Sequence, residues 1–274
     1  MPPEEEKRQE QFLLLLLALA GTTEGRINRA LRPVLVQTML RVRRAVQTLS
    51  PAGQFRIYEW ARLSPKILPI LEAIPKAMLP ELLREVQMML PTVQEAAAEF
   101  ARPNDPTPVD IVPLTQQQLL ATLAVAGAGP LSSLMGRSTI NRYTLQMAKE
   151  LDMLVRGMIL SEATTQEISD KILKLTTVNG KPAGQIKTGS FANKMWNRTK
   201  NTSAAVVWDG VTKTVTKKLI DTPAKEWIWN AVLDPETCPV CRPLNGQKRE
   251  KPGQFDRLPP LHPNCRCAVL PLFG

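Results

Sequence analysis

Histidine is nearly absent from this sequence, since His262 is the only one among 274 residues. A metal site that needs two histidines, such as the H-E-x-x-H motif of metalloproteases, is therefore excluded, as is a nuclease with separate ligand and base histidines. A Ser-His-Asp triad would have to use His262. Aromatic residues make up only 5% of the chain, so its core must rest mainly on Leu, Ile, Val, Met and Ala. The hydrophobic content of 43% is typical of a folded protein.

The sequence also lacks an apolar run long enough to cross a membrane. The run Phe12–Ala20 has nine residues, whereas a spanning helix needs about 20. Glutamates at positions 4, 5 and 6 precede it, where a secretory signal peptide carries basic residues. We interpret the run as the start of a buried helix and expect neither a targeting signal nor a membrane span. We also expect an intracellular, reducing setting, in which cysteines act first as thiols or metal ligands.

Acidic residues are almost missing from one stretch of the chain. The sequence has 35 Lys and Arg against 25 Asp and Glu, a net charge of +10, and residues 171–218 hold ten basic residues and one acidic residue, a net +9. Such a field attracts nucleic acid or an acidic protein surface, while an ordinary solvated face is the alternative. The candidate contact residues are Lys171, Lys174, Lys181, Lys187, Lys194, Arg198, Lys200, Lys213, Lys217 and Lys218.

Apolar residues at helical spacing predict that residues 1–101 form a helical N-terminal region. Residues 4–50 read as helical with an interruption at Glu24–Arg26, and residues 53–101 as shorter helices punctuated by prolines. Residues 102–114 contain four prolines, which cannot sustain a helix or a central strand. This segment is predicted to be an extended linker and the main domain boundary.

Residues 115–220 predict a second helical region whose second half is basic. Helices are expected over 138–160, from Thr164 or Thr165 onward, and over 191–220, with a loop or hairpin over 176–190. Residues 221–274 have a different composition, with strand-like segments at 226–233 and 268–271. The expected fold is therefore mainly α with a small C-terminal β-rich subdomain, an α+β protein.

All four cysteines and the single histidine lie within thirty residues of the C-terminal region. The C-x-x-C motif places two thiolates on one turn, and a second pair of ligands completes a tetrahedron that suits Zn²⁺. We expect four of the five candidates to bind a structural zinc that stabilises the β-rich subdomain. The favoured set is Cys238, Cys241, His262 and Cys265, with Cys267 as the substitute.

Three other interpretations of the cysteines stay open. They can form two disulfides in an oxidising compartment. They can be buried free thiols, because cysteine packs well as a small apolar residue. One of them can be a catalytic thiol activated by His262.

The residues around this cluster carry a family resemblance. Trp227, Trp229, Leu233-Asp234, Thr237-Cys238-x-x-Cys241, Leu244-Asn245-Gly246 and Pro260-Leu261-His262-Pro263-Asn264-Cys265-Arg266-Cys267 follow one another in the order of a known signature. The pattern resembles the C-terminal part of the Mu F-like minor head proteins of tailed bacteriophages, also called the phage head morphogenesis family. Weaker similarity at Arg156–Ile168 and at Asn197–Thr199 extends the resemblance to about residues 155–271. Lys200 departs from it, because an acidic residue is common there, and residues 1–113 show no resemblance.

The resemblance implies a structural role in head assembly. Proteins of this family are minor components of the virion head, associated with the portal vertex, without an established catalytic activity. The implied partners are the portal or the major capsid protein, and packaged double-stranded DNA is a further target for the basic stretch. The implied location is the head interior or the portal vertex of a virion assembled in the bacterial cytoplasm. No small-molecule substrate and no enzymatic activity are expected.

Two alternatives belong to other functional classes. One is a zinc-stabilised nucleic-acid-binding protein outside a virion, although the sequence shows no recognition helix or RNA-binding motif. The other is a nuclease or thiol-dependent hydrolase, with Asp234 and Glu236 beside Cys238 as candidate catalytic groups. Asp234 is more simply explained as a turn residue before Pro235.

Overall fold

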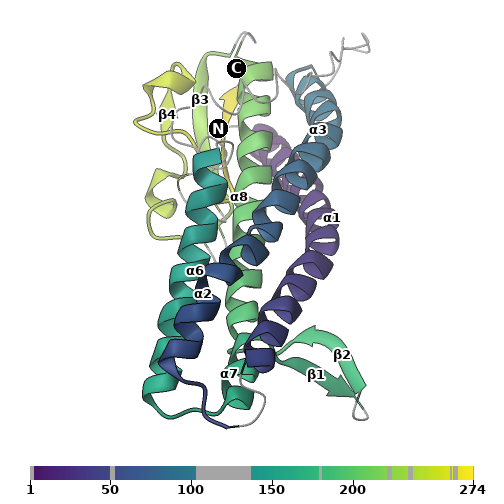
Figure 1. Ribbon diagram of the computed structural model, residues 1–274. Helices are drawn as coiled ribbons and strands as arrows, with labels where there is room; N and C mark the ends of the chain where they lie inside the picture. Colours follow the sequence, from purple (N-terminus) through teal and green to yellow (C-terminus); the bar gives the residue numbers. More distant parts are fainter. Residues whose placement is uncertain are drawn as a thin grey trace. The chain divides into compact units, whose positions relative to one another are not determined.

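The computed structural model describes residues 3–49, 53–102, 137–178, 181–220, 224–233, 237–259, 261 and 265–273, with side chains except for residues 137–142 and 176–184. Figure 1 shows long helices, a two-stranded hairpin and a small C-terminal sheet. The helices are α1 (Pro3–Leu49), α2 (Ile57–Leu71), α3 (Ala73–Ala101), α6 (Arg137–Leu160), α7 (Thr165–Ile172) and α8 (Phe191–Leu219). The strands are β1 (Leu175–Val178), β2 (Lys181–Ile186), β3 (Glu226–Ala231), β4 (Lys248–Arg249) and β5 (Cys267–Leu272), with 3-10 turns η1 (Arg242–Leu244) and η2 (Pro252–Gln254). The prediction of a mainly helical chain with a small C-terminal sheet is confirmed.

Helix α1 runs without a break through Glu24–Arg26, where the sequence predicts an interruption. Gly25 costs a helix only about 1 kcal/mol relative to alanine. Buried residues continue along one face on both sides of it, at Ala20, Ile27 and Leu31. The packing of this continuous apolar face outweighs the local cost, since most helical stability in proteins comes from tertiary contacts.

Helix α3 is a single helix of 29 residues, although shorter helices divided by prolines are predicted there. Pro75 lies in the first turn, where the N–H that proline lacks has no helical partner. Pro80 and Pro91 lie in the interior, where each removes one backbone hydrogen bond and costs about 3 kcal/mol. Val86 and Val93 are buried between and beyond them, so burial of the apolar face keeps the helix intact.

The chain divides into two compact units, each assembled from segments that are distant in the sequence. Unit 1 comprises Met1–Ile27, Leu82–Ser133 and Asn201–Gly274, and unit 2 comprises Asn28–Glu81 and Leu134–Lys200. Helices α1, α3 and α8 each contribute a part to both units. The predicted linker at 102–114 lies outside the described residues except for Arg102, so this domain boundary stays a prediction.

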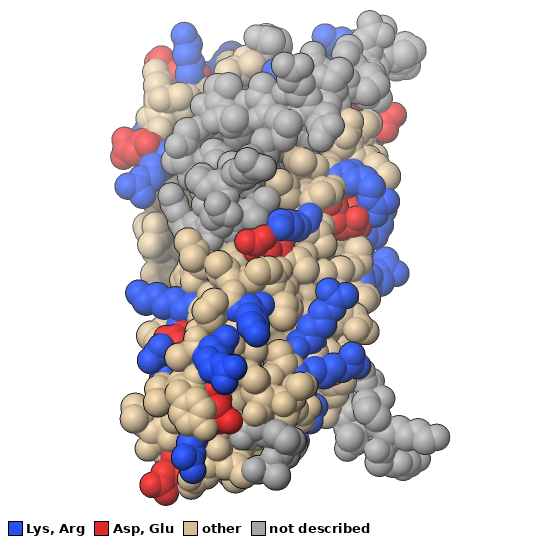
Figure 2. Space-filling view, viewed as in Figure 1, with Lys and Arg blue, Asp and Glu red and all other residues tan. Residues whose placement is uncertain are grey.

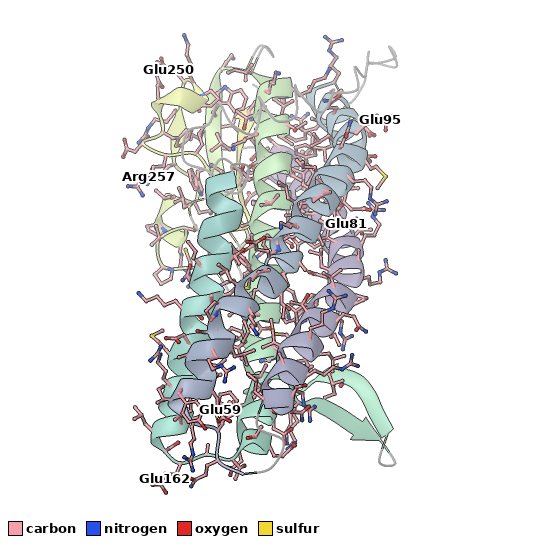
Figure 3. All side chains as sticks on the ribbon, in the orientation of Figure 1. Glu59, Glu81, Glu95, Glu162, Glu250 and Arg257 are labelled. Carbon is pink, nitrogen blue, oxygen red and sulfur yellow. The ribbon has the colours of Figure 1, made fainter. Side chains whose placement is uncertain are left out.

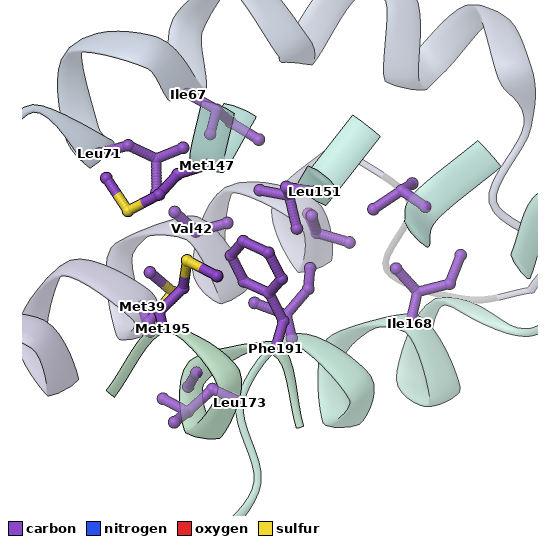
Figure 4. Packing of buried hydrophobic residues seen from close by; sticks show 14 of the residues in the cluster. Met39, Val42, Ile67, Leu71, Met147, Leu151, Ile168, Leu173, Phe191 and Met195 are labelled. Atoms are coloured by element: carbon purple, nitrogen blue, oxygen red, sulfur yellow. The ribbon is translucent and has the colours of Figure 1, made fainter. Parts of the chain in front are cut away.

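Unit 2 has a core of buried aliphatic residues, methionines and a few aromatics from six helices. Figure 4 shows the Phe191 ring, at the start of α8, between Val42 of α1 and Leu151 of α6. The indole N–H of the buried Trp60 in α2 donates to a carboxylate oxygen of Asp152 in α6, at 2.7 Å. The hairpin β1–β2 follows α7, as expected for residues 176–190.

Unit 1 contains the C-terminal sheet, with strand order β4-β3-β5 and antiparallel pairing throughout. Strands β3 and β5 pair along six residues, from Glu226 opposite Leu272 to Ala231 opposite Cys267. Both strands are at the positions that their composition predicts. Since side chains alternate between faces along a strand, Cys267 and Val269 share the face of Ala231 and Trp229, while Ala268 lies on the other.

The start of α1 anchors this sheet. Gln9 accepts a hydrogen bond from the Asn230 amide at 2.7 Å and donates to the Pro271 carbonyl at 3.3 Å. Phe12 of α1 stacks on Phe100 of α3, with ring centroids 4.3 Å apart. The apolar run that resembles a signal peptide is thus part of the core of unit 1. In the described part of the chain, no helix combines the length and the apolar character that spanning a bilayer requires.

Candidate metal centre

The C-x-x-C motif forms a closed turn. The backbone N–H groups of Cys241 and Arg242 both donate to the Cys238 carbonyl at 3.1 Å, and the N–H of Cys241 also donates to the Cys238 Sγ at 3.2 Å. The Thr237 hydroxyl donates to the Val232 carbonyl and so fixes the entry to the turn. Backbone N–H groups directed at a sulfur favour its thiolate form, which is the form that binds metals.

The Leu-Asn-Gly segment after the turn holds it against the sheet. The side-chain oxygen of Asn245 accepts the N–H of Ala231 in β3 at 2.8 Å. The N–H of Gly246 donates to the Trp229 carbonyl at 2.8 Å, and Gly246 has a φ of +81°, which favours glycine. These residues of the signature therefore position the cysteine turn beside β3.

The second pair of cysteines lies at the start of β5. Cys265 precedes the strand and Cys267 begins it, and the alternation of side chains along extended backbone puts both thiols on the same face. Both residues are only 2% exposed, as is Cys241. The structure therefore brings together thiols from two segments more than twenty residues apart.

The sulfur atoms of Cys241, Cys265 and Cys267 all lie within 4.8 Å of one another. The Sγ atoms of Cys241 and Cys265 are 3.8 Å apart, which is too long for a disulfide of about 2.05 Å. None of the four cysteines forms a disulfide. With zinc–sulfur bonds of about 2.3 Å, a tetrahedral site separates its sulfur atoms by about 3.8 Å. The separation of the Cys241 and Cys265 sulfurs is thus that of two ligands of one zinc ion, and the Cys267 sulfur lies within 4.8 Å of both.

Burial and mutual contact shift the thiol pKa values in opposite directions. The hydrogen bond with Cys267, helped by backbone bonds from Leu261 and Cys267, lowers the pKa of Cys265 to about 5 despite its burial. Burial raises the pKa of Cys241 to about 12, and the hydrogen bond with Cys265 raises the pKa of Cys267. Without a cation, three buried thiols cannot all carry a negative charge, whereas a bound divalent ion deprotonates its thiol ligands. The three thiols therefore suit a thiophilic cation such as Zn²⁺.

Not every predicted ligand belongs to this cluster. Cys238 is half-buried and is not one of the three grouped sulfurs, although its thiol hydrogen-bonds that of Cys241. His262 lies outside the described residues, as do Asp234 and Glu236, the candidate groups of a hydrolase. The structure places Cys267, which the sequence ranks as the substitute, inside the cluster.

Helix α8 supports the cluster from behind. The indole N–H of Trp208 donates a hydrogen bond to the Cys267 carbonyl at 3.0 Å. The Thr212 hydroxyl donates to the Pro259 carbonyl at 3.4 Å. Sequence reasoning missed both residues, because only their spacing in α8, one turn apart, distinguishes them. On the other side, Trp229 packs on Phe255 with ring centroids 5.9 Å apart. Figure 3 shows Glu250 and Arg257, which lie on either side of Phe255 in the sequence, projecting outward, and both are exposed.

The predicted basic contact residues are distributed over both units. Seven belong to unit 2 and three, Lys213, Lys217 and Lys218, to unit 1. Several are neutralised by neighbours in their own unit. Lys194 and Arg198 bind Glu150 at 2.8 and 2.7 Å. The remaining pairs and contacts join Lys174 to Asp170, Lys213 to Asp209, and Lys200 to the Trp196 ring.

Four other predicted contact residues have no acidic partner in the part of the chain that the structure describes. Three of them, Lys171, Lys187 and Lys217, are exposed, and the fourth, Lys218, is half-exposed. The side chain of Lys181 lies outside that part. Figure 2 shows a further predominance of basic over acidic side chains where α1 and α2 lie. The exposed basic residues of these two helices in unit 2 are Arg29, Arg41, Arg44, Arg62 and Lys66. The absence of any acidic residue from 28–49 is the sequence signal for this second basic surface.

The fold and the site define a class of protein. It is mainly helical, and its small C-terminal sheet carries a buried cluster of cysteines. Residues 157–270 match the family model of Phage Mu protein F like proteins, which confirms the resemblance of the C-terminal part. The match supports a phage head morphogenesis protein. Comparison with curated proteins and with solved structures gives no match.

Proposed function

We propose that this protein is a structural minor head protein of a tailed bacteriophage, located at the portal vertex or on the inside of the capsid and assembled in the cytoplasm of the host. The observation that supports it most is the family match, because residues 157–270 include the cysteine turn and most of β5. The proposal includes no catalytic activity. A single histidine and a buried thiol cluster offer no evident general acid and base pair for hydrolysis.

The proposed role of the metal is structural. Cys241, Cys265 and Cys267 are almost fully buried, and a catalytic zinc keeps a coordination position open to water or substrate. A buried zinc would instead hold the turn at 238–242 against β5. The metal then fixes the shape of the C-terminal subdomain on which assembly contacts depend.

The proposed partners are the portal protein or the major capsid protein, together with packaged double-stranded DNA. The unpaired lysines of the 171–218 stretch support an acidic counterpart, and so do the exposed arginines of α1. A protein that neutralises phosphates with such residues binds DNA without sequence preference and loses affinity as salt increases. An acidic protein surface would be bound by the same side chains.

The test is co-assembly. The full chain is co-expressed with the portal and major capsid proteins of the same phage genome, and purified particles and portal rings are analysed by mass spectrometry. We expect the protein in both preparations, and we expect the purified chain not to hydrolyse DNA. Absence from particles and rings alike would overturn the proposal, as would nuclease activity that a variant of Asp234 abolishes.

Duplex DNA binding, measured across a range of salt concentrations, decides between the two counterparts of the basic surface. We expect affinity at low salt that falls steeply as salt rises. The variant Lys171→Glu with Lys187→Glu should weaken it. Lys225→Glu with Lys251→Glu, at two exposed lysines of the other unit, makes the same charge change away from these residues and is the matched control. If the chain does not bind DNA even at low salt, the lysines are assigned to a protein partner.

A further inference from the structure

We propose that the metal is held by all four cysteines, Cys238, Cys241, Cys265 and Cys267, as a tetrathiolate zinc site, and that His262 is not a ligand. The assignment rests on the structural zinc of the proposed function. It differs from the set that the sequence favours, in which His262 takes one position and Cys267 is left out.

Three of the four tetrahedral positions are filled by grouped thiols. Cys241, Cys265 and Cys267 have their sulfur atoms within 4.8 Å of one another, and one pair already has the 3.8 Å spacing of a zinc tetrahedron. Because Cys267 is the first residue of β5 and pairs with Ala231 in the register of the sheet, its place is fixed by the strand. A ligand set without Cys267 would leave a buried thiol in contact with the metal site but unused.

Cys238 is the residue placed to fill the fourth position. Its thiol is in hydrogen-bonding contact with that of Cys241, which belongs to the group. Its sulfur also accepts the backbone N–H of Cys241 at 3.2 Å, the arrangement in which a C-x-x-C turn presents two sulfurs to one ion. The Cys238 sulfur lies outside the group of three, and rotation about the Cα–Cβ bond redirects it while the two backbone bonds to the Cys238 carbonyl keep the turn closed.

The chain around the cluster can balance the charge of four thiolates. A zinc ion with four thiolates carries a net charge of −2, which burial disfavours unless donors and cations compensate it. Backbone N–H groups already point at the sulfurs of Cys238 and Cys265. Arg242 follows one ligand, and Arg266 stands between two others in the sequence. A histidine ligand would reduce the negative charge, but the donors for a tetrathiolate are in place.

The experiment uses the full chain, purified under reducing conditions with zinc as the only added metal. Elemental analysis should find one zinc per chain. X-ray absorption should show a single shell of sulfur at about 2.3 Å, without the nitrogen shell at about 2.0–2.1 Å that a histidine adds. A nitrogen ligand in the wild-type shell overturns the assignment but leaves a structural zinc in place, and co-assembly with portal or capsid is measured separately.

Two variants make the comparison direct. His262→Ala should keep one zinc and an unchanged sulfur shell. Removing a residue that only hydrogen-bonds a metal ligand costs about 10–100-fold in metal affinity. Because Cys238 is proposed to be a ligand itself, Cys238→Ser should lower the zinc affinity by more than this. If His262→Ala instead loses the metal while Cys238→Ser keeps it, the assignment is wrong. The helical far-UV signal serves as the folding control, and if Cys238→Ser does not fold, the wild-type sulfur shell decides. Binding of iron in place of zinc, or of no metal by freshly reduced protein, also overturns it.

Discussion

At the scale of single residues, Asp209 in α8 is a buried carboxylate that is paired with a lysine of its own helix. The Asp209 side chain is 2% exposed. Its Oδ2 atom forms an ion pair with the Nζ atom of Lys213, one helical turn away, at 2.6 Å. Burial raises the pKa of Asp209, and the hydrogen bond and charge of Lys213 oppose that rise. A charge in such a site persists only with a partner, because removing one member of a buried pair leaves the other uncompensated.

Lys213→Met is expected to destabilise the protein by about 3–5 kcal/mol at neutral pH, the usual cost of breaking a buried pair. The loss should shrink at acidic pH. Since the folded-state pKa of Asp209 lies above its unfolded value, its ionisation costs stability as pH rises through the folded pKa, and removing Lys213 increases that cost. Urea unfolding of the variant and the wild type at neutral and at acidic pH measures both effects.

Lys217→Met is the matched control, because Lys217 lies one turn further along α8 and is exposed. It should change the unfolding free energy by less than about 0.5 kcal/mol at either pH. The double variant Lys213→Met with Asp209→Asn should recover much of the loss, because no charge is then left buried. Equal effects of Lys213→Met and Lys217→Met would show that the ion pair does not contribute.

At the scale of elements, α7 is the helix that depends most on its cap. It has eight residues, and isolated helices of this length are marginal in water. The Thr164 hydroxyl accepts the N–H of Glu167 at 3.2 Å, while a Glu167 carboxylate oxygen accepts the N–H of Thr164 at 2.7 Å. This reciprocal arrangement is a capping box, and it stands where the sequence predicts the start of a helix, at Thr164 or Thr165.

Thr164→Ala is expected to reduce stability by about 1 kcal/mol, because it leaves a backbone N–H of the first turn without its partner. Amide hydrogen exchange in α7 should accelerate more than in α6. Thr48→Ala is the control, since the exposed Thr48 hydroxyl only bonds a carbonyl of its own helix, at 2.8 Å. If the two variants have the same stability, the cap does not hold α7.

The elements also show how far sequence reasoning reaches. Caps, strand composition and the hairpin are local, so α7, β3 and β5 could be located from residues close in the chain. The continuity of α1 and α3 could not, because glycine and proline disfavour helix locally and only the burial of residues such as Val86 overrides them. The place of Cys267 in the cluster depends on the register of β5 against β3, which spacing alone does not reveal.

At the scale of the whole molecule, the segment 237–266 has almost no core of its own. Its buried side chains in the described part are Cys241, Pro252, Phe255, Pro259 and Cys265. Two of these five are proposed metal ligands. So small an apolar set cannot order a segment of this length, and small subdomains of this kind commonly rely on a metal. Unit 2, in contrast, has a large buried cluster that includes no residue of this segment.

Removal of the metal should therefore disorder this segment and leave unit 2 folded. With a strong chelator under reducing conditions, we expect amide exchange to rise sharply over 237–259 and at the start of β5, while amides of α6 and α7 keep their protection. The helical far-UV signal should fall little, because the segment holds only short 3-10 turns and β4. Added zinc should restore protection, and magnesium, which prefers oxygen ligands, should not. Unchanged exchange would mean that the segment is held without a metal. Loss of protection throughout the chain would mean that the two units unfold as one.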